Sequence, residues 1–508
     1  MISSETTKPA VFQEVYALQE PYVYAAIVKE KDTQKIRYQV IEPTLQQDEE
    51  KHLHEIKNLL MEELDVNLKE IENKEKAENY LKQKIKELVK KYRIKIPAEA
   101  VDKLTYYIIR DFTGYGKIDP LMKDPLIEDI SADGVNIPLY VWHRLYESLP
   151  TNIMFTDAAE LDSFVIHLAY LSGKNISIAT PILDASLPDG SRIQITYGRE
   201  VTKRGSTFTI RRFKTDPLTI SDLIAFKTIS SEMAAYLWVC LENRASVMVL
   251  GGTAAGKTTA LNALGCLIKP GSKIMTIEET AELNLSHENW VSLISRQSYG
   301  LGGSSVGEVA LFDLVKTCMR HRPDLMIVGE VRGQEAYVLF QALATGHGGM
   351  CTMHAENVQS AVRRLTQKPM DISPAYIPLM NIVISVQRVH LVKNGEKKAH
   401  RRILSVNEIV DAEKFLNPFK WDPIKDQQTI DLGGSFLLGN FSERLGITRE
   451  QLLAEMNRRT DVLHWMRKGN IRSYKEVASI IAEYYARPKE FYRKIMDTEE
   501  KKIVAANR

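Results

Sequence analysis

The chain has 508 residues, of which 44% are hydrophobic and 26% charged, which is ordinary for a soluble globular protein of roughly two to four domains. Its 67 basic and 65 acidic side chains leave a net charge of +2, without the basic surplus typical of proteins that bind duplex nucleic acid. No apolar run is long enough for a membrane span, residues 1–10 carry no apolar signal, and the four cysteines form no C-x-x-C pair, so we expect a cytosolic chain with reduced core thiols and no zinc site.

The first part of the chain, residues 1–96, combines strand-like and helical patterns. Residues 22–28 and 36–41 read as strands. From residue 46 to 92, leucine and isoleucine recur at steps of three and four, and charges of both signs fill the other face. This pattern predicts amphipathic helices with a solvated surface.

The composition changes over residues 97–213, which we predict to form a second α/β domain. The connector that follows contains Pro217 and is predicted to be a linker over residues 214–220. The predicted elements of the second domain are a helix over residues 98–110, a glycine-rich turn over 113–116, strands over 139–142 and 192–196, and a helix over 158–171.

Strands and helices alternate over residues 221–410. This rhythm predicts a largely parallel sheet with helices on its faces. The expected buried strands cover residues 247–250, 274–277, 325–328 and 382–386.

From residue 411 to 508 the sequence again favours helices. Two capping-box patterns, Thr448-x-x-Gln451 and Ser473-x-x-Glu476, mark predicted helix starts. The chain as a whole is therefore predicted to be an α/β protein with a helical tail.

One motif decides the functional prediction. The segment from Gly251 to Thr258 reads GGTAAGKT and fits G-x-x-x-x-G-K-[ST], with a predicted strand before it and a helix after it. Such a loop points several backbone N–H groups at one anion, and the helix N-terminus adds partial positive charge. Lys257 is expected to reach the β- and γ-phosphates, and the Thr258 hydroxyl to bind Mg²⁺. The predicted nucleotide-binding residues are Gly251, Gly252, Thr253, Ala254, Ala255, Gly256, Lys257, Thr258 and Thr259.

Acidic residues follow two other predicted strands. Glu330 comes directly after the strand 325–328 and its glycine, and Glu278 opens an acidic cluster over residues 278–282. Carboxylates at the carboxyl ends of parallel strands lie beside the phosphate loop in such sheets. We therefore expect Glu330 to polarise the attacking water or hold Mg²⁺ through water, and Glu278 to face the same site with Thr258.

Two histidines, His347 and His354, stand on either side of a short apolar stretch. Neutral imidazoles in this place are expected to sense the γ-phosphate or to pass its presence to the next subunit.

These four segments, in this order and spacing, resemble the secretion-ATPase superfamily, which powers type II and type IV secretion, type IV pilus extension and retraction, and the archaellum. Residues 251–258 match its Walker A motif, 278–282 its Asp box, 324–330 its Walker B motif and 346–354 its His box. The family norm at the second position of the Asp box is Asp, where this chain has Glu279, so Glu278 is the stronger catalytic candidate.

The second domain also looks like the archaeal branch of this superfamily, over residues 114–121, 127–131, 184–192 and 204–211. By position, Arg192 and Arg211 match arginines that reach across a subunit boundary or fold onto the nucleotide. Arg320 and Lys316 align with other basic residues near the phosphates. The four-cysteine metal domain of bacterial type II members is not seen in this sequence, which argues against that subfamily. The resemblance, together with the motifs, gives these catalytic candidates: Glu330, Glu278, Lys257, Arg192, Arg211, Arg320 and His354.

The resemblance implies a RecA-like motor domain over residues 221–410 that works with ATP and Mg²⁺ in a homohexamer. It also implies a position at the inner face of the cell membrane, where residues 1–96 dock on a polytopic platform protein that moves filament or secreted subunits. No nucleic-acid partner is expected. Two alternatives stay open: a DNA-translocating P-loop ATPase, which the near-neutral charge opposes, and a nucleotide-binding scaffold without turnover, which the intact Lys257, Thr258 and Glu330 oppose.

Overall fold

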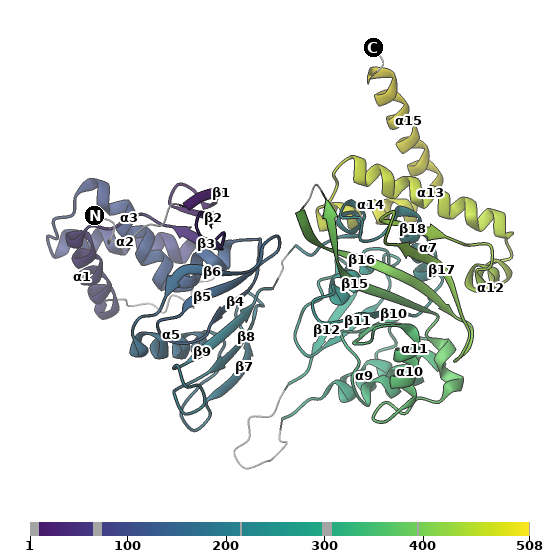
Figure 1. Ribbon diagram of the computed structural model, residues 1–508, viewed down its shortest axis with the longest axis horizontal. Coiled ribbons are helices and arrows are strands. Elements are labelled where there is room, and N and C mark those ends of the chain that lie inside the picture. Colours follow the sequence, from purple (N-terminus) through teal and green to yellow (C-terminus); the bar gives the residue numbers. More distant parts are fainter. Residues whose placement is uncertain (1–9, 64–73, 214–215, 297–306, 394–395, 507–508) are drawn as a thin grey trace. The chain divides into compact units, whose positions relative to one another are not determined.

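A computed structural model describes residues 10–63, 74–213, 216–296, 307–393 and 396–506. The chain divides into two compact units, Met1–Phe213 and Lys214–Arg508, shown in purple to teal and in teal to yellow in Figure 1. The finer division into five parts stays a prediction.

Unit 1 is built on a nine-stranded sheet in the order β1-β2-β3-β6-β5-β4-β9-β8-β7. Its pairs are antiparallel except for β3 and β6, which are parallel. Because β3 joins β6, the predicted boundary after residue 96 does not coincide with a break in the sheet. The strands are β1 (Ala10–Gln19), β2 (Val23–Glu30), β3 (Ile36–Ile41), β4 (Ile127–Ala132), β5 (Pro138–His143), β6 (Glu147–Met154), β7 (Ile182–Ser186), β8 (Arg192–Thr196) and β9 (Thr207–Arg211).

The helices of unit 1 form where the sequence shows helical periodicity. Ile56, Leu60, Leu81 and Leu104 are buried in a small core that the first three helices share. Of the predicted helical stretch over residues 46–92, residues 64–73 lie outside the described part of the chain. The helices are α1 (Gln47–Glu63), α2 (Lys74–Lys91), α3 (Ala98–Phe112), the 3₁₀ turn η2 (Gly116–Ile118), α4 (Asp119–Lys123) and α5 (Ala158–Leu171).

Unit 2 has its own nine-stranded sheet, in the order β12-β11-β13-β14-β10-β15-β16-β17-β18. The strands from β12 to β15 pair in parallel, and β15 to β18 pair antiparallel. This confirms the predicted parallel-rich sheet. The strands are β10 (Val247–Leu250), β11 (Ile274–Glu278), β12 (Trp290–Ile294), β13 (Leu325–Val328), β14 (Gly348–Met353), β15 (Ile382–Lys393), β16 (Glu396–Ile409), β17 (Phe415–Asp422) and β18 (Gln427–Ile430).

Helices cover the sheet of unit 2, and further helices follow toward the C-terminus (Figure 1). Residues 214–215 of the predicted linker lie outside the described part, and Thr219, still within that linker, caps α6 in a capping box with Asp222. The helices around the sheet are α6 (Ile220–Ala225), α7 (Ser231–Glu242), α8 (Lys257–Gly265), α9 (Leu311–Arg320), α10 (Glu335–Ala344), α11 (Val358–Thr366) and the 3₁₀ segment η3 (Pro374–Leu379). All four cysteines lie in this unit, free and buried as predicted: Cys240, Cys266, Cys318 and Cys351.

The C-terminal part is helical, as predicted, but β17 and β18 precede its helices α12 (Phe436–Leu445), α13 (Arg449–Lys468), α14 (Tyr474–Ala486) and α15 (Pro488–Ala506). The capping box at Thr448 forms with Gln451. Ser473 is the N-cap of α14, which confirms the predicted helix start, but its side chain makes no cap hydrogen bond. Residue spacing alone does not set the side-chain rotamer on which a box depends.

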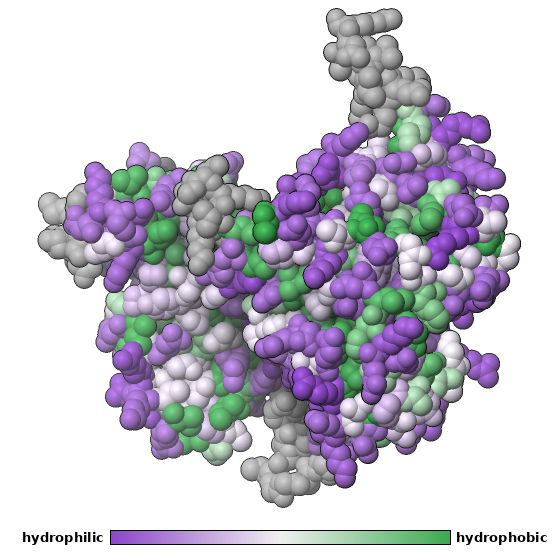
Figure 2. Space-filling model, turned by 45° about the vertical axis from the view of Figure 1, so that its right-hand side comes forward, coloured by the Kyte–Doolittle hydropathy of each residue, from purple (hydrophilic) through white to green (hydrophobic). Residues whose placement is uncertain are grey.

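The C-terminal helices share the core of unit 2. Arg459 of α13 is 4% exposed, and its guanidinium lies 4.9 Å from the ring centre of Trp238 in α7. It also pairs with Glu242 of α7. Figure 2 shows hydrophilic side chains over most of the visible surface, with apolar side chains in separate patches. Among the described residues, no helix has both the length and the hydropathy to cross a bilayer.

A buried ion pair fixes β16 against the β17–β18 turn. Arg402 is 1% exposed, and its Nε and Nη2 atoms donate to the two carboxylate oxygens of Asp426 at 2.7 and 3.0 Å. Removing one partner leaves an uncompensated buried charge. We expect Asp426→Ala to lower the free energy of unfolding by about 3–5 kcal/mol in urea denaturation.

The matched control for this exchange is Glu490→Ala in α15. Glu490 is 75% exposed and lies 4.0 Å from Arg487. Its loss is expected to change the free energy of unfolding by less than about 1 kcal/mol. Equal effects of the two exchanges would contradict the role given to the buried pair.

Candidate functional site

The loop between β10 and α8 has the shape that its glycines require. A Cβ atom on Gly251 would lie 2.6 Å from the carbonyl oxygen of Val386, so a larger residue does not fit there. Gly256 has a φ of 95°, in the left-handed region, and is the N-cap of α8 without a side-chain cap hydrogen bond. The first N–H groups of α8 thus open toward the loop, as in an anion-binding helix start.

Much of the loop is exposed, although Ala255 is buried. Lys257 Nζ donates to the carbonyl oxygen of Gly252 at 3.1 Å, so the lysine folds back over the loop. Thr253 Oγ1 lies 3.0 Å from His354 Nε2. Gly252, Thr253 and Ala254 are exposed. Thr258 and Thr259 follow in the first turn of α8 and are half-buried.

The order of the strands gathers the predicted acidic residues along the edge that carries the loop. From β10, the neighbours are β14, β13 and β11 in turn, all parallel, so their carboxyl ends meet at one edge. His354 follows β14, Glu330 follows β13 and Glu278 ends β11. The backbone N–H of Gly329 donates to Ile277, which keeps the ends of β13 and β11 together.

Glu278 is a buried carboxyl, 3% exposed. Its Oε1 accepts from the backbone N–H groups of Glu282 and Leu283, both at 3.0 Å. Its Oε2 has no hydrogen-bond partner in the described part of the chain. Burial raises the pKa of Glu278 to about 7; the two backbone donors oppose this rise, and the charge of Glu282 adds to it. A carboxyl group with this pKa gains and loses its proton near neutral pH, as a general base must.

Arg332 is a site residue that sequence reasoning missed. Its Nη2 donates to Glu330 Oε2 at 2.6 Å, and its Nη1 donates to Glu279 Oε2 at 3.3 Å. The hydrogen bond to Glu330 is the main cause that raises the pKa of Arg332. The arginine therefore ties the acidic ends of β13 and β11 together. Its position, two residues after Glu330, is the signal that could have found it.

His347 is not brought to the loop of its own chain, and its predicted role, to sense the γ-phosphate or to pass its presence to the next subunit, stays a prediction. It precedes β14, whereas His354 follows it. A six-residue strand separates its two ends by about 20 Å at the usual rise of ~3.3 Å per residue. His347 Nδ1 instead lies 3.0 Å from Thr345 Oγ1.

Arg320 also lies away from the loop of its own chain. It ends α9 and leads into the amino end of β13, the edge of the sheet opposite to the loop. The next residue, His321, accepts a hydrogen bond at this edge from Lys273, just before β11. Arg320 and Lys316 are exposed. Their predicted place near the phosphates of a nucleotide stays a prediction.

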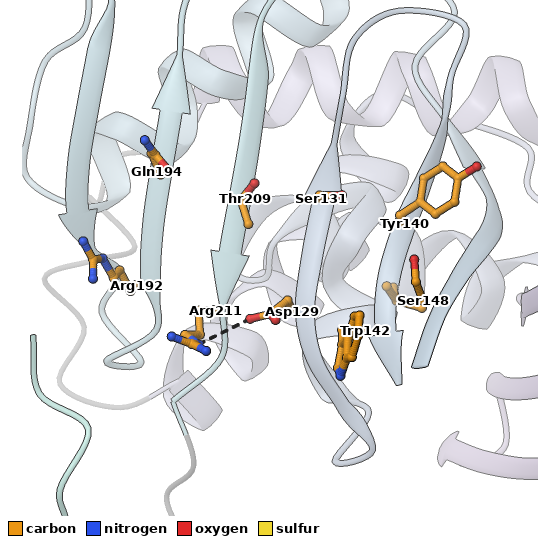
Figure 3. Close-up of a pocket in the computed structure, with 10 residues that line it drawn as sticks. Asp129, Ser131, Tyr140, Trp142, Ser148, Arg192, Gln194, Thr209 and Arg211 are labelled. Carbon is orange, nitrogen blue, oxygen red and sulfur yellow. Dashed lines mark ion pairs between the residues drawn. The ribbon is translucent and has the colours of Figure 1, made fainter. Parts of the chain in front are cut away.

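Arg192 and Arg211 lie side by side on one face of the sheet of unit 1 (Figure 3). They are direct partners across β8 and β9. Arg192 donates to both carboxylate oxygens of Asp184, at 3.1 and 2.6 Å, and Arg211 Nε lies 3.6 Å from Asp129 Oδ1. They line a hollow of about 520 Å³ with Tyr140, Trp142 and Gln194. Each of the two arginines thus lies beside a carboxylate in this structure, and their predicted contact with nucleotide stays a prediction.

Comparison with known proteins gives one family match. The family model described as "Type II/IV secretion system protein" matches residues 129–418, which include the whole of the predicted motor domain. The uncharacterized protein MJ0900 of Methanocaldococcus jannaschii is 37% identical over 402 residues, 77% of this chain and 71% of that protein. The uncharacterized protein MJ1287 of the same organism is 38% identical over 271 residues, 52% of this chain and 97% of that protein. Among solved structures, the VirB11 ATPase from the Brucella suis type IV secretion system, in complex with sulphate, is 23% identical with a TM-score of 0.28, over 56% of this chain and 90% of that chain.

Proposed function

Because the chain belongs to the type II/IV secretion system protein family, we propose that it is an ATPase that hydrolyses ATP to power the assembly of a type IV pilus-like filament or secretion across the membrane. One observation carries the proposal. The loop with Lys257 and the carboxylates Glu278 and Glu330 occupy one edge of the same sheet.

The loop residues would bind the phosphates of ATP. The N–H groups at the start of α8 and the backbone around Gly256 offer donors to the β-phosphate. Lys257, which bonds to Gly252 in this structure, would turn to the β- and γ-phosphates. Its charge stabilises the negative charge that develops during phosphoryl transfer.

The residues at this edge fit Mg²⁺. The Thr258 hydroxyl and the carboxylates of Glu278 and Glu330 are hard oxygen donors, and the Oε2 of Glu278 is buried without a partner among the described residues. These three residues would hold the ion directly or through water. When bound, Mg²⁺ neutralises charge on the phosphates. Glu278 would accept the proton of the attacking water, and Arg332 would hold the carboxylate of Glu330 in place.

The proposal includes a ring and a membrane partner. We propose a homohexamer at the inner face of the membrane, in which Arg192 and Arg211 reach the nucleotide from their own chain or from a neighbour. Residues 1–96 would dock on a polytopic platform protein, which transmits force to filament or secreted subunits. The family membership and the paired arginines of unit 1 support this arrangement.

Phosphate release by the purified full chain tests the function. With Mg²⁺ and ATP, we expect steady release of phosphate and a native mass of a hexamer of the 57.7 kDa chain. Stimulation by DNA, rather than by the platform protein in vesicles, would favour a DNA-translocating ATPase instead. Nucleotide binding without phosphate release would favour a scaffold. If the protein neither binds nor splits ATP, the proposal fails.

A further inference from the structure

The antiparallel ribbon of β15 and β16 continues past the loop between β10 and α8, residues 251–256. Leu250, the last residue of β10, pairs with Ser385 of β15. Where β10 ends and the loop begins, β15 runs on to Lys393 and stays paired with β16. The close contact between Gly251 and the carbonyl oxygen of Val386 shows that the ribbon touches the loop there.

The pattern on one face of this ribbon changes next to the loop. Val386 and Ile403 are cross-strand partners and belong to the core that also contains Ala255 and Ala260 of the loop and α8. Because side chains alternate between faces, the next partners on this face are Arg388 and Arg401, which also pair directly. An apolar pair is thus followed by two arginines. The register places two guanidinium groups on one face of the ribbon, beyond the end of β10.

Arg401 lies against the loop itself. Its Nε is 3.4 Å from the carbonyl oxygen of Ala254, and its Cδ is 3.0 Å from the place that a Cβ on Gly256 would take. The next residue, Arg402, fixes the backbone here, because its Nη1 donates to the carbonyl oxygen of Arg401 at 2.9 Å while Asp426 holds its other nitrogens. Arg401 is therefore carried on an anchored strand at the rim of the loop.

We propose that Arg401 and Arg388 form a second cationic wall of the nucleotide site and bind the phosphate chain of a nucleoside triphosphate. This inference rests on the proposed function. β15 flanks β10 on the side away from β14, so the wall lies on the opposite side of the loop from Glu330 and Glu278. Guanidinium groups suit this role because their planar fork binds phosphate through two hydrogen bonds. The known motifs of the sequence include neither arginine.

The test measures equilibrium binding of Mg-ATP and of inorganic tripolyphosphate to the full chain and to Arg388→Gln, Arg401→Gln and the double variant. We expect each single exchange to lower the affinity for both ligands about tenfold, the order of magnitude of one charge-assisted hydrogen bond. The double exchange is expected to lower both affinities further. The salt dependence of ATP binding is expected to fall in each variant. If the arginines served only to pack the loop, their exchange would not change the slope of ATP affinity against salt concentration. Arg401→Lys, which keeps the charge without the fork, is expected to restore part of the affinity.

Arg467→Gln is the matched control, because Arg467 is an exposed arginine in the last turn of α13; its affinities and slope are expected to equal those of the wild type. If the variants bind ATP more weakly but bind tripolyphosphate as well as the wild type does, the arginines contact the nucleoside. That result would contradict their proposed binding of the phosphate chain. If the wild type binds ATP and the arginine variants bind it equally well, this inference fails while the proposed function stands. If the wild type binds neither ligand, the proposed function fails first.

Discussion

Replacing Lys257 with alanine is expected to lower the turnover number for ATP roughly 10²–10³-fold, the loss typical when one charge-stabilising donor is removed from a transition state. Lys257 stands at the first position of α8, and in this structure its amine donates to the carbonyl oxygen of Gly252 in the loop. In that position its charge is available to the β- and γ-phosphates. Phosphate release under saturating Mg-ATP measures the effect.

Lys269→Ala is the matched control for the lysine exchange. Lys269 is exposed and comes after the C-terminal end of α8. Its exchange for alanine therefore removes the same charge, but at a position away from the loop. We expect its turnover number to stay at the wild-type value. If Lys257→Ala hydrolysed ATP at the wild-type rate, the reaction would not take place at this loop.

The Glu278→Gln exchange is expected to reduce kcat/KM about 10²–10⁴-fold, the usual contribution of a general base. Glutamine keeps the size of the side chain and can still accept from Glu282 and Leu283, but it cannot take a proton from water. The loss therefore reports proton transfer rather than packing. The same exchange at Glu288, which is exposed before the amino end of β12, is expected to leave kcat/KM unchanged.

The pH dependence of the wild type gives an independent test of Glu278. Its pKa is about 7, and only the deprotonated form accepts a proton, so kcat/KM is expected to rise about tenfold per pH unit below 7 and to level off above it. The Glu278→Gln variant should lack this rise. A wild-type profile that stays flat between pH 5 and pH 8 would exclude Glu278 as the base.

The same pKa links Glu278 to stability. Its folded-state pKa of about 7 lies above the ordinary value of 4.5, so the folded chain holds this proton more tightly than the unfolded chain. The contribution of Glu278 to stability is therefore complete below pH 4.5 and is lost as the pH rises to about 7. The free energy of unfolding of Glu278→Gln, measured by denaturation between pH 4.5 and pH 7, should not show this loss. The raised pKa of Glu278 can thus be detected without any measurement of activity.

The sequence by itself determined the features that depend on neighbouring residues. The loop from Gly251 to Thr258 is contiguous, so the roles predicted for its glycines, Lys257 and Thr258 rest on neighbouring residues alone. The strands 247–250 and 325–328 have the predicted bounds, because short apolar runs are typical of buried parallel strands. The acidic positions Glu278 and Glu330 followed from the same rule, since the carboxyl ends of parallel strands meet at one edge.

Only the tertiary structure decided which side chains meet across long stretches of sequence. His347 and His354 look equivalent in the sequence, but the apolar stretch between them is itself a strand, so they end at opposite edges of the sheet. Arg332 meets Glu279 through the pairing of β13 with β11. Arg401, about 150 residues after the loop, reaches it because β16 pairs with β15 and β15 with β10. Strand order and register are set by burial over the whole sheet, and no local pattern around these residues encodes them.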